Sequence, residues 1–359
     1  MIKVTNKKDR TMKNIFLTLS LFVLLFASCS NNQEMPKPQQ EESGHISKNE
    51  VHKNYVYSLF MNSDQCSYQM YRNNEKFAIF NTETSRKVVA MEVYSGDCYL
   101  LISNSTKDSV NLPSEIYKNG KPAMIFQENF TATDFNIVDG HFYVLGSFAD
   151  SVITVFKDGV RYFNTPKNGK KPLKIRFYDD MVYFVVYSSG KTEVYNEEKK
   201  LFEIEGECQD FAISDIGIYV MADGKIYHNG KMFMEGGNNY TFLRKELIAE
   251  PKFFSISDKY CYTGVDAALN KSLHYAGVFK NRDPFITIKP DDKPLGSSPY
   301  QTRCCGISAC KNGAYFVTVN CIDEKNYCQN TFHYYFETDE VFSLEPSGEN
   351  AKLIFIKGY

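Results

Sequence analysis

The sequence predicts an all-β fold built from a repeated unit of about 40 residues. A tyrosine recurs seven times in short apolar runs typical of β-strands: Tyr57, Tyr99, Tyr143, Tyr183, Tyr219, Tyr262 and Tyr315. An aromatic residue and a turn follow each tyrosine, and another turn precedes most of them, which indicates four strands per unit. This pattern is typical of a β-propeller, and we predict seven blades of four antiparallel strands.

The second unit illustrates the expected strand order, named a to d from the axis outward. We expect strand a near 88–94, strand b near 98–103, strand c near 114–117 and strand d near 121–126. Strands c and d are joined at Tyr117-Lys118-Asn119-Gly120, where Asn-Gly adopts the positive φ angles of a tight hairpin. Equivalent aromatic residues before a turn are Tyr71, Phe156, Tyr195, Tyr227, Phe279 and Tyr335.

The two ends of the chain predict how the ring closes. Residues 352–356 resemble a strand a with nothing after it, and residues 55–60 resemble a strand b with no strand a before it. Pairing the two completes blade one and leaves no open edge, so we predict a propeller domain over residues 54–359. The alternative is an open two-sheet sandwich of similar hairpins, which requires no regular period.

The composition fits a single ring. Of 359 residues, 15% are aromatic, with 25 Tyr and 28 Phe, and these residue types favour strands. The formal net charge is −2, with both signs scattered along the sequence, so we expect no nucleic-acid partner. No second long apolar segment follows residue 30, so no other part of the sequence is predicted to span a membrane.

The N-terminus indicates export. A short basic region at Met12-Lys13-Asn14 precedes an apolar stretch from Ile15 to Ala27. The stretch ends in Phe26-Ala27-Ser28-Cys29, which resembles the lipobox of bacterial lipoproteins, with Phe26 in place of the usual Leu. The resemblance implies that residues 1–28 are a cleaved signal peptide and that the Cys29 thiol carries palmitate-type acyl chains. The alternative is an ordinary secretory signal.

Residues 29–53 are polar and have no apolar period, so we expect a flexible tether between the lipid anchor and the ring. This organisation predicts a lipid-anchored protein of the cell envelope. The membrane we expect is the outer membrane, on its periplasmic side or at the cell surface.

Cysteine usage fits an exported protein. The chain has 10 cysteines, and removing Cys29 leaves an odd number, so at least one thiol is free. Cys98 and Cys261 directly precede recurring tyrosines, and we expect both in the core.

A disulfide between Cys321 and Cys328 is the pairing we expect, because these residues flank a predicted loop of blade seven. The alternative is a zinc site that also uses Cys304 or Cys305. Its ligand type is suitable, but the C-x₂-C pairs of structural zinc sites are missing. We therefore predict no metal and no cofactor.

Loop lengths suggest where a ligand binds. The a–b and c–d turns share one face of the ring and are short. The b–c and d–a loops share the other, the long-loop face, and vary in length at 104–113, 235–251, 266–272, 289–303 and 321–330. Variable loops on a rigid scaffold commonly carry binding sites. We predict a ligand site there with stacking rings and forked donors from Tyr240, Arg244, Tyr300 and Arg303. The alternative is that each caps its own loop.

Motifs with known chemistry are scarce. The sequence has no G-x-S-x-G, no H-E-x-x-H and no Gly-rich phosphate loop. Two strings, Asp108-Ser109-Val110 and Asp150-Ser151-Val152, resemble the acceptor for O-glycosylation of exported proteins in some Gram-negative anaerobes. The resemblance implies modification at Ser109 and Ser151.

The aromatic-Lys-Asn-Gly unit at Tyr117–Gly120, with variants at Phe156–Gly159 and Tyr227–Gly230, is similar to that of a group of bacterial propeller lipoproteins. The resemblance covers residues 55–359 and the lipobox, and it implies an exported ring without catalytic residues to transfer. We predict a non-enzymatic binding or scaffold module for a glycan or an envelope protein. The alternative is a glycan-processing hydrolase or lyase with its site at the propeller mouth.

Overall fold

The computed structural model describes most of the chain after residue 54. The described residues are 55–62, 64–104, 112–127, 129–148, 152–236, 238–242, 245–257, 259–269, 273–288, 301–310, 312–321, 327–347 and 351–359. Within the ranges 238–248, 268–274 and 320–330, and at residue 301, side chains are not described. The chain divides into Met1–His52 and Lys53–Tyr359, and the description concerns the second part. The predicted signal peptide, Cys29 and most of the tether lie outside the described residues.

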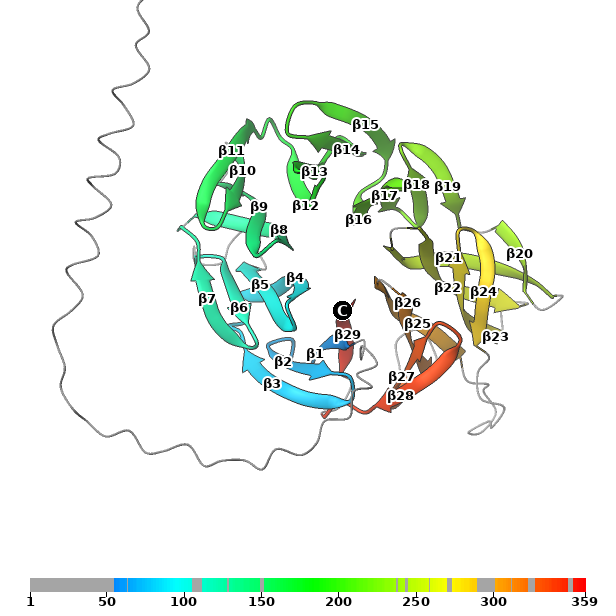
Figure 1. The fold of residues 1–359 in the computed structure, drawn as a ribbon. Helices are drawn as coiled ribbons and strands as arrows, with labels where there is room; N and C mark the ends of the chain where they lie inside the picture. The colour runs from blue at the N-terminus through cyan, green and yellow to red at the C-terminus, as the bar shows by residue number, and fades with distance from the viewer. Residues whose placement is uncertain are drawn as a thin grey trace, which may run out of the picture. The chain divides into compact units, whose positions relative to one another are not determined.

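The described residues form seven antiparallel sheets arranged as blades around an axis (Figure 1). Blade one contains β29 (Lys352–Gly358), β1 (Val56–Met61), β2 (Ser67–Arg72) and β3 (Glu75–Asn81). Blade two contains β4 (Arg86–Tyr94), β5 (Asp97–Asn104), β6 (Glu115–Lys118) and β7 (Lys121–Ile125). Blade three contains β8 (Phe130–Val138), β9 (His141–Phe148), β10 (Val152–Lys157) and β11 (Val160–Pro166). Blade four contains β12 (Lys171–Tyr178), β13 (Met181–Ser188), β14 (Lys191–Asn196) and β15 (Lys200–Glu205).

The remaining blades complete the ring. Blade five contains β16 (Cys208–Ser214), β17 (Gly217–Ala222), β18 (Lys225–His228) and β19 (Lys231–Glu235). Blade six contains β20 (Asn238–Phe242), β21 (Lys245–Ile256), β22 (Cys261–Leu269), β23 (Leu273–Lys280) and β24 (Asp283–Ile288). Blade seven contains β25 (Gln301–Cys310), β26 (Gly313–Cys321), β27 (Tyr327–Phe336) and β28 (Asp339–Leu344). The predicted seven-bladed propeller is therefore confirmed. No helix that could cross a membrane is found in the described part of the chain.

The ring closes as predicted, through the two ends of the chain. β1 pairs antiparallel with β29, from Val56↔Gly358 to Met61↔Lys352. At the end of this pairing the backbones of Tyr55 and Tyr359 exchange two hydrogen bonds, of 3.2 and 2.8 Å. The C-terminal strand is therefore the inner strand of the blade that the N-terminal strands begin.

The recurring turn residues have a structural cause. In every blade, a side-chain oxygen of the c–d turn accepts a hydrogen bond from the backbone N–H that precedes the recurring tyrosine. In blade two, Asn119 Oδ1 accepts from Cys98 N–H at 2.9 Å. The equivalent acceptors are Asn73, Asp158, Glu197, Asn229, Asn281 and Glu337. Asn119 has a φ of 49°, a conformation that asparagine tolerates better than most residues. The polar turn therefore fastens each outer hairpin to strand b.

The hydrophobic core lies between neighbouring blades. One cluster joins Ala90 and Leu101 of blade two to Phe130, Phe135 and Val144 of blade three, all at most 4% exposed. Burial of such side chains removes apolar surface from water and stabilises the contact between blades. The expected core position of two cysteines is confirmed, because Cys98 and Cys261 are each 1% exposed.

One predicted loop is largely β-structure. The segment 235–251 was expected to be a connection, but β20 pairs with the first half of β21, from Asn238↔Ala249 to Phe242↔Lys245. Blade six consequently has five strands. Gly and Asn residues at the start of this segment indicate a loop, whereas the Tyr, Thr, Phe, Leu and Ile that follow favour strands, and the pairing follows the second group.

Candidate functional site

The residues predicted to bind a ligand lie mostly beyond what the structure describes. Tyr240 belongs to β20, where only the backbone is described, and Arg244 and Tyr300 lie outside the described residues. Arg303 is half-buried in β25, in register with Val319. It does not line the cavity on the axis of the ring that is described below. The structure therefore does not test whether these four side chains come together, and their site stays a prediction.

The structure does not test the predicted glycosylation sites or the predicted disulfide. Ser109 and Ser151 lie outside the described residues. Cys321 ends β26 and Cys328 lies in β27, but neither side chain is described, so the disulfide stays a prediction. Among the described residues, no three His, Cys, Asp or Glu side chains are grouped as a metal site requires.

A cavity of about 560 Å³ lies on the axis of the ring and is lined by all seven inner strands. The lining segments belong to the later part of most of these strands, such as Lys252–Ile256 of β21 and Cys305–Ala309 of β25. The cavity is therefore closer to the short a–b turns than to the long-loop face. Its size falls in the range of small-ligand sites in proteins.

Two rings of side chains make the wall of this cavity, and strand register defines both. The tyrosine-paired ring contains the strand a residues directly opposite the recurring tyrosines: Lys357, Glu92, Asn136, Arg176, Ala212, Ser255 and Ser308. The bulge ring contains the residues two positions earlier: Phe355, Ala90, Asp134, Lys174, Asp210, Phe253 and Gly306. All of these residues except Asn136 line the cavity.

A β-bulge explains the regularity of the second ring. In all seven inner strands the register shifts at one equivalent place, next to the bulge-ring residue; in β8 the shift falls between Ala132 and Asp134. A bulge inserts one unpaired residue and redirects the side chains beside it. It therefore places a second residue of each inner strand on the channel side.

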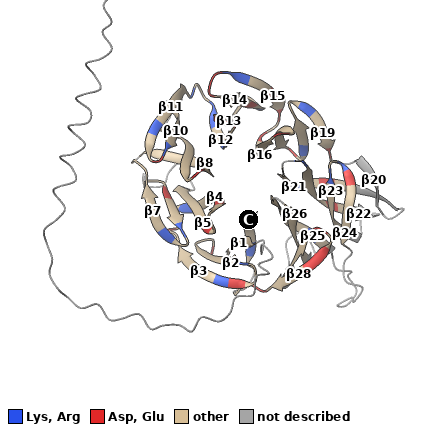
Figure 2. Cartoon of the chain, viewed as in Figure 1, with Lys and Arg blue, Asp and Glu red and all other residues tan. Residues whose placement is uncertain are grey.

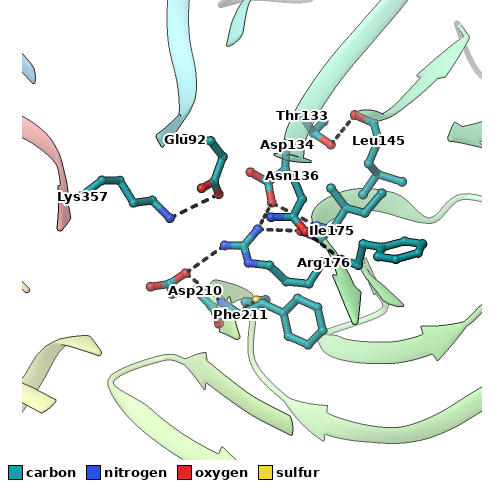
Figure 3. A network of polar contacts seen from close by, with 12 residues as sticks. Glu92, Thr133, Asp134, Asn136, Leu145, Ile175, Arg176, Asp210, Phe211 and Lys357 are labelled. Atoms are coloured by element: carbon teal, nitrogen blue, oxygen red, sulfur yellow. Dashed lines mark hydrogen bonds and ion pairs between the residues drawn. The ribbon is translucent and has the colours of Figure 1, made fainter. Parts of the chain in front are cut away.

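Charged residues of both signs lie along the outer strands, for example on β3 and β15, and a smaller set lies on the inner strands (Figure 2). At the cavity, Arg176 of blade four lies between two aspartates from the adjacent blades (Figure 3). Its Nη1 is 2.8 Å from Asp134 Oδ2, and its Nη2 is 4.0 Å from Asp210 Oδ1. Burial would lower the pKa of the Arg176 guanidinium, but Asp134, Glu92 and Asp210 together raise it above its usual value.

The tyrosine-paired ring also connects neighbouring blades. Lys357 Nζ of blade one lies 3.2 Å from Glu92 Oε1 of blade two (Figure 3). Asn136 Oδ1 accepts a hydrogen bond from the backbone of blade four, Ser255 Oγ from that of blade seven, and Ser308 Oγ from that of blade one. These contacts hold the cavity wall in one geometry, which favours a preformed site over a flexible one.

The bulge ring has a polar side and an apolar side. Blades three to five contribute Asp134, Lys174 and Asp210, whereas blades six, seven, one and two contribute Phe253, Gly306, Phe355 and Ala90. Phe253 is 36% exposed although it belongs to an inner strand. Gly306 is required by packing, because a Cβ at this position would lie 2.8 Å from Ile356 Cγ2. The cavity therefore presents charges along one arc and an open aromatic face on the other.

Sequence reasoning missed these residues, although a signal for them exists. In blades two to seven, the tyrosine-paired residue lies seven positions before the recurring tyrosine, as Glu92 does before Tyr99. The bulge-ring residue lies nine positions before it. In blades two to seven these two positions hold five charged residues, Glu92, Asp134, Lys174, Arg176 and Asp210, so their spacing from the tyrosines would have identified them.

No protein-family model and no curated protein match the chain. Among solved structures, Hsv2 of Kluyvelomyces marxianus is 11% identical, with 81% of this chain and 98% of that chain covered and a TM-score of 0.44. AztD from Citrobacter koseri is 9% identical, with 85% and 98% covered and a TM-score of 0.42. BamB from Moraxella catarrhalis is 8% identical, with 81% and 83% covered and a TM-score of 0.40. The fold assignment rests on the strand pairing, and no function is taken from these matches.

Proposed function

We propose that this chain is a non-enzymatic binding module whose axial cavity takes a ligand. The observation that carries the proposal is the bridge from Asp134 through Arg176 to Asp210, which fixes charged groups from three blades at the wall of a cavity of about 560 Å³. Fixed donors and acceptors in a concave site of this size provide orientation and specificity without reordering on binding.

The arrangement of the carboxylates favours binding over hydrolysis. A glycosidase uses two carboxyl groups that flank the scissile bond and are available to it. Each cavity-lining carboxylate uses one of its oxygens in a contact within the protein. Asp134 accepts from Ile175 N–H at 3.0 Å and from Arg176, Asp210 accepts from Phe211 N–H at 2.8 Å, and Glu92 pairs with Lys357. A hydrolase or lyase with its site at the propeller mouth is therefore the less supported alternative.

Filling the cavity tests the proposal. Ala212 of β16 lines the cavity and is half-buried, so Ala212→Phe places a ring in the cavity. We expect compounds detected by ligand-observed NMR on the native ring to lose their signal with Ala212→Phe, at an unchanged melting temperature. If a mixed library of sugars, carboxylates and peptides contains no such compound, the proposal is wrong.

The predicted long-loop site and the predicted anchor have tests of their own. Binding to Tyr240, Arg244, Tyr300 and Arg303 would survive Ala212→Phe, because that variant changes only the axial cavity. We also propose display on the cell envelope through lipidated Cys29. A Cys29→Ser chain expressed in a bacterial host should incorporate no palmitate analogue and should leave the membrane fraction, whereas equal retention of both forms would contradict the anchor.

A further inference from the structure

The side chains of the bulge ring, together with Arg176, indicate the chemical class of the ligand. We propose that the axial cavity binds the end of a neutral saccharide chain, with one sugar ring packed on Phe253 and its hydroxyl groups facing Asp134, Lys174 and Asp210. This inference rests on the proposed function, because it names the ligand of the same cavity.

The charges of the polar arc balance one another, and the other lining cations are paired, Lys357 with Glu92 and Lys252 with Glu250. Lys174 and Arg176 lie on the same strand, and Asp134 and Asp210 come from the blades on either side. An anionic ligand at this wall would meet two carboxylates, and a cationic ligand would meet an ammonium and a guanidinium. Like charges at close range oppose binding. A neutral ligand avoids both penalties.

The same arc offers free donors and acceptors side by side. Among the described residues, Asp134 makes its polar contacts through Oδ2 and Asp210 through Oδ1, so Asp134 Oδ1 and Asp210 Oδ2 accept no hydrogen bond there. The Lys174 ammonium has no hydrogen-bond or ion-pair partner within the described ranges, and it lines the cavity. A hydroxyl group both donates and accepts, so adjacent hydroxyls of a sugar match a carboxylate oxygen beside an ammonium.

The opposite arc supplies the apolar surface that a sugar ring also needs. Sugars expose C–H groups on one face, and an aromatic ring provides a flat surface for that face. Phe253 is the large apolar side chain of the described cavity wall with the greatest exposure, at 36%. An aromatic carboxylate would use Phe253 equally well but would face the two aspartates.

Calorimetric titration of the full ring with defined disaccharides tests the inference. The probes are maltose, cellobiose, lactose, mannobiose and N,N′-diacetylchitobiose, with digalacturonate and the glucosamine disaccharide as charged comparators. We expect at least one neutral probe to bind, and both charged comparators to bind at least about tenfold more weakly. Tighter binding of either charged comparator would overturn the inference.

Variants of Phe253 separate stacking from general binding. Phe253→Ala should weaken the best neutral probe about tenfold, and Phe253→Trp should retain it. Phe77→Ala is the matched control, because Phe77 is 37% exposed on the outer strand β3, and its affinity should stay within about twofold of the native value. Unchanged affinity in Phe253→Ala, with a native melting temperature, would also overturn the inference.

The failure of this inference is distinguishable from failure of the proposed function. If no neutral disaccharide binds but another compound is displaced by Ala212→Phe, the cavity is a binding site and the saccharide class is wrong. If neutral disaccharides bind the native ring and the Ala212→Phe variant equally, they bind outside the cavity and the saccharide inference is wrong. The proposed function is wrong as well only if no compound of the mixed library loses its signal with Ala212→Phe.

Discussion

The ammonium of Lys357 lies 3.2 Å from the carboxylate of Glu92, and this contact joins the last strand of the chain to blade two. The same strand pairs with β1 in blade one and packs against β25 of blade seven. β29 therefore contacts three consecutive blades, and its packing should be important for the stability of the whole ring.

We expect Leu353→Ala to lower the free energy of unfolding by about 2–4 kcal/mol. Leu353 is 7% exposed and belongs to a core cluster with Tyr315 and Val317 of blade seven, so truncation leaves a cavity between two blades. Denaturant unfolding followed by tyrosine fluorescence measures the change. Its neighbour Lys352 is exposed, and Lys352→Ala should change the stability by less than about 0.5 kcal/mol. Equal effects of the two variants would show that β29 is not packed as described.

Asp134→Asn should destabilise the ring by about 3 kcal/mol, because it leaves the largely buried Arg176 without its closest anion. Asp134 is 3% exposed and Arg176 17% exposed at the side chain, and the amide oxygen of asparagine still accepts from Ile175 N–H. The loss of stability therefore measures the contribution of the negative charge of Asp134. Denaturant unfolding at neutral pH measures it.

The double variant Asp134→Asn with Arg176→Met is the control for this prediction. It removes both charges, so it should be more stable than Asp134→Asn alone. The single variant Arg176→Met completes the comparison. If the losses of unfolding free energy in the two single variants add up to the loss in the double variant, Asp134 and Arg176 are not coupled, and the bridge described at the cavity wall is wrong.

The fold was predictable because its determinants recur in the sequence. Tyr99, the Asn119 turn and their counterparts occupy equivalent positions in every blade, and each turn makes the same hydrogen bond to the residue before the tyrosine. Because one physical contact selects these residues seven times, their spacing identifies the repeat. Residues 238–249 do not follow this repeat, since they add a hairpin that the other blades lack in the described part of the chain.

The cavity was not predictable in the same way. Asp134 and Arg176 are 42 residues apart and meet only because consecutive inner strands lie side by side around the axis. The seven bulges also decide which side chains face the channel, and a bulge leaves no composition signal in an isolated strand. The residues of the site vary from blade to blade, whereas repeat analysis finds what stays the same.

Asn119→Ala should lower the free energy of unfolding by about 1–2 kcal/mol, because it removes the acceptor for Cys98 N–H and places alanine at a φ of 49°. Asn119→Gly removes the same acceptor but tolerates the backbone conformation. It should therefore be the more stable of the two variants, and thermal unfolding measures the difference. An alanine variant as stable as the native ring would show that the turn contact does not fasten the outer hairpin.

Glu193 of β14 gives a pH dependence with a defined sign. Burial would raise the pKa of Glu193, but contacts with Lys170, Lys200 and Tyr195 lower it from 4.5 to about 2. The folded state therefore binds this proton less readily than the unfolded chain, and the stabilisation is present above pH 4.5 and lost as the pH falls through about 2. Relative to Glu193→Gln, the native ring should be more stable by about 2 kcal/mol at neutral pH, and this difference should shrink only as the pH falls below about 4.5. Glu205→Gln, at a 77% exposed side chain, should show less than about 0.5 kcal/mol at any pH. Denaturant unfolding of the three proteins between pH 2.5 and 7 makes the comparison, and a difference between native and Glu193→Gln that is independent of pH would contradict the ion-pair network of blade four.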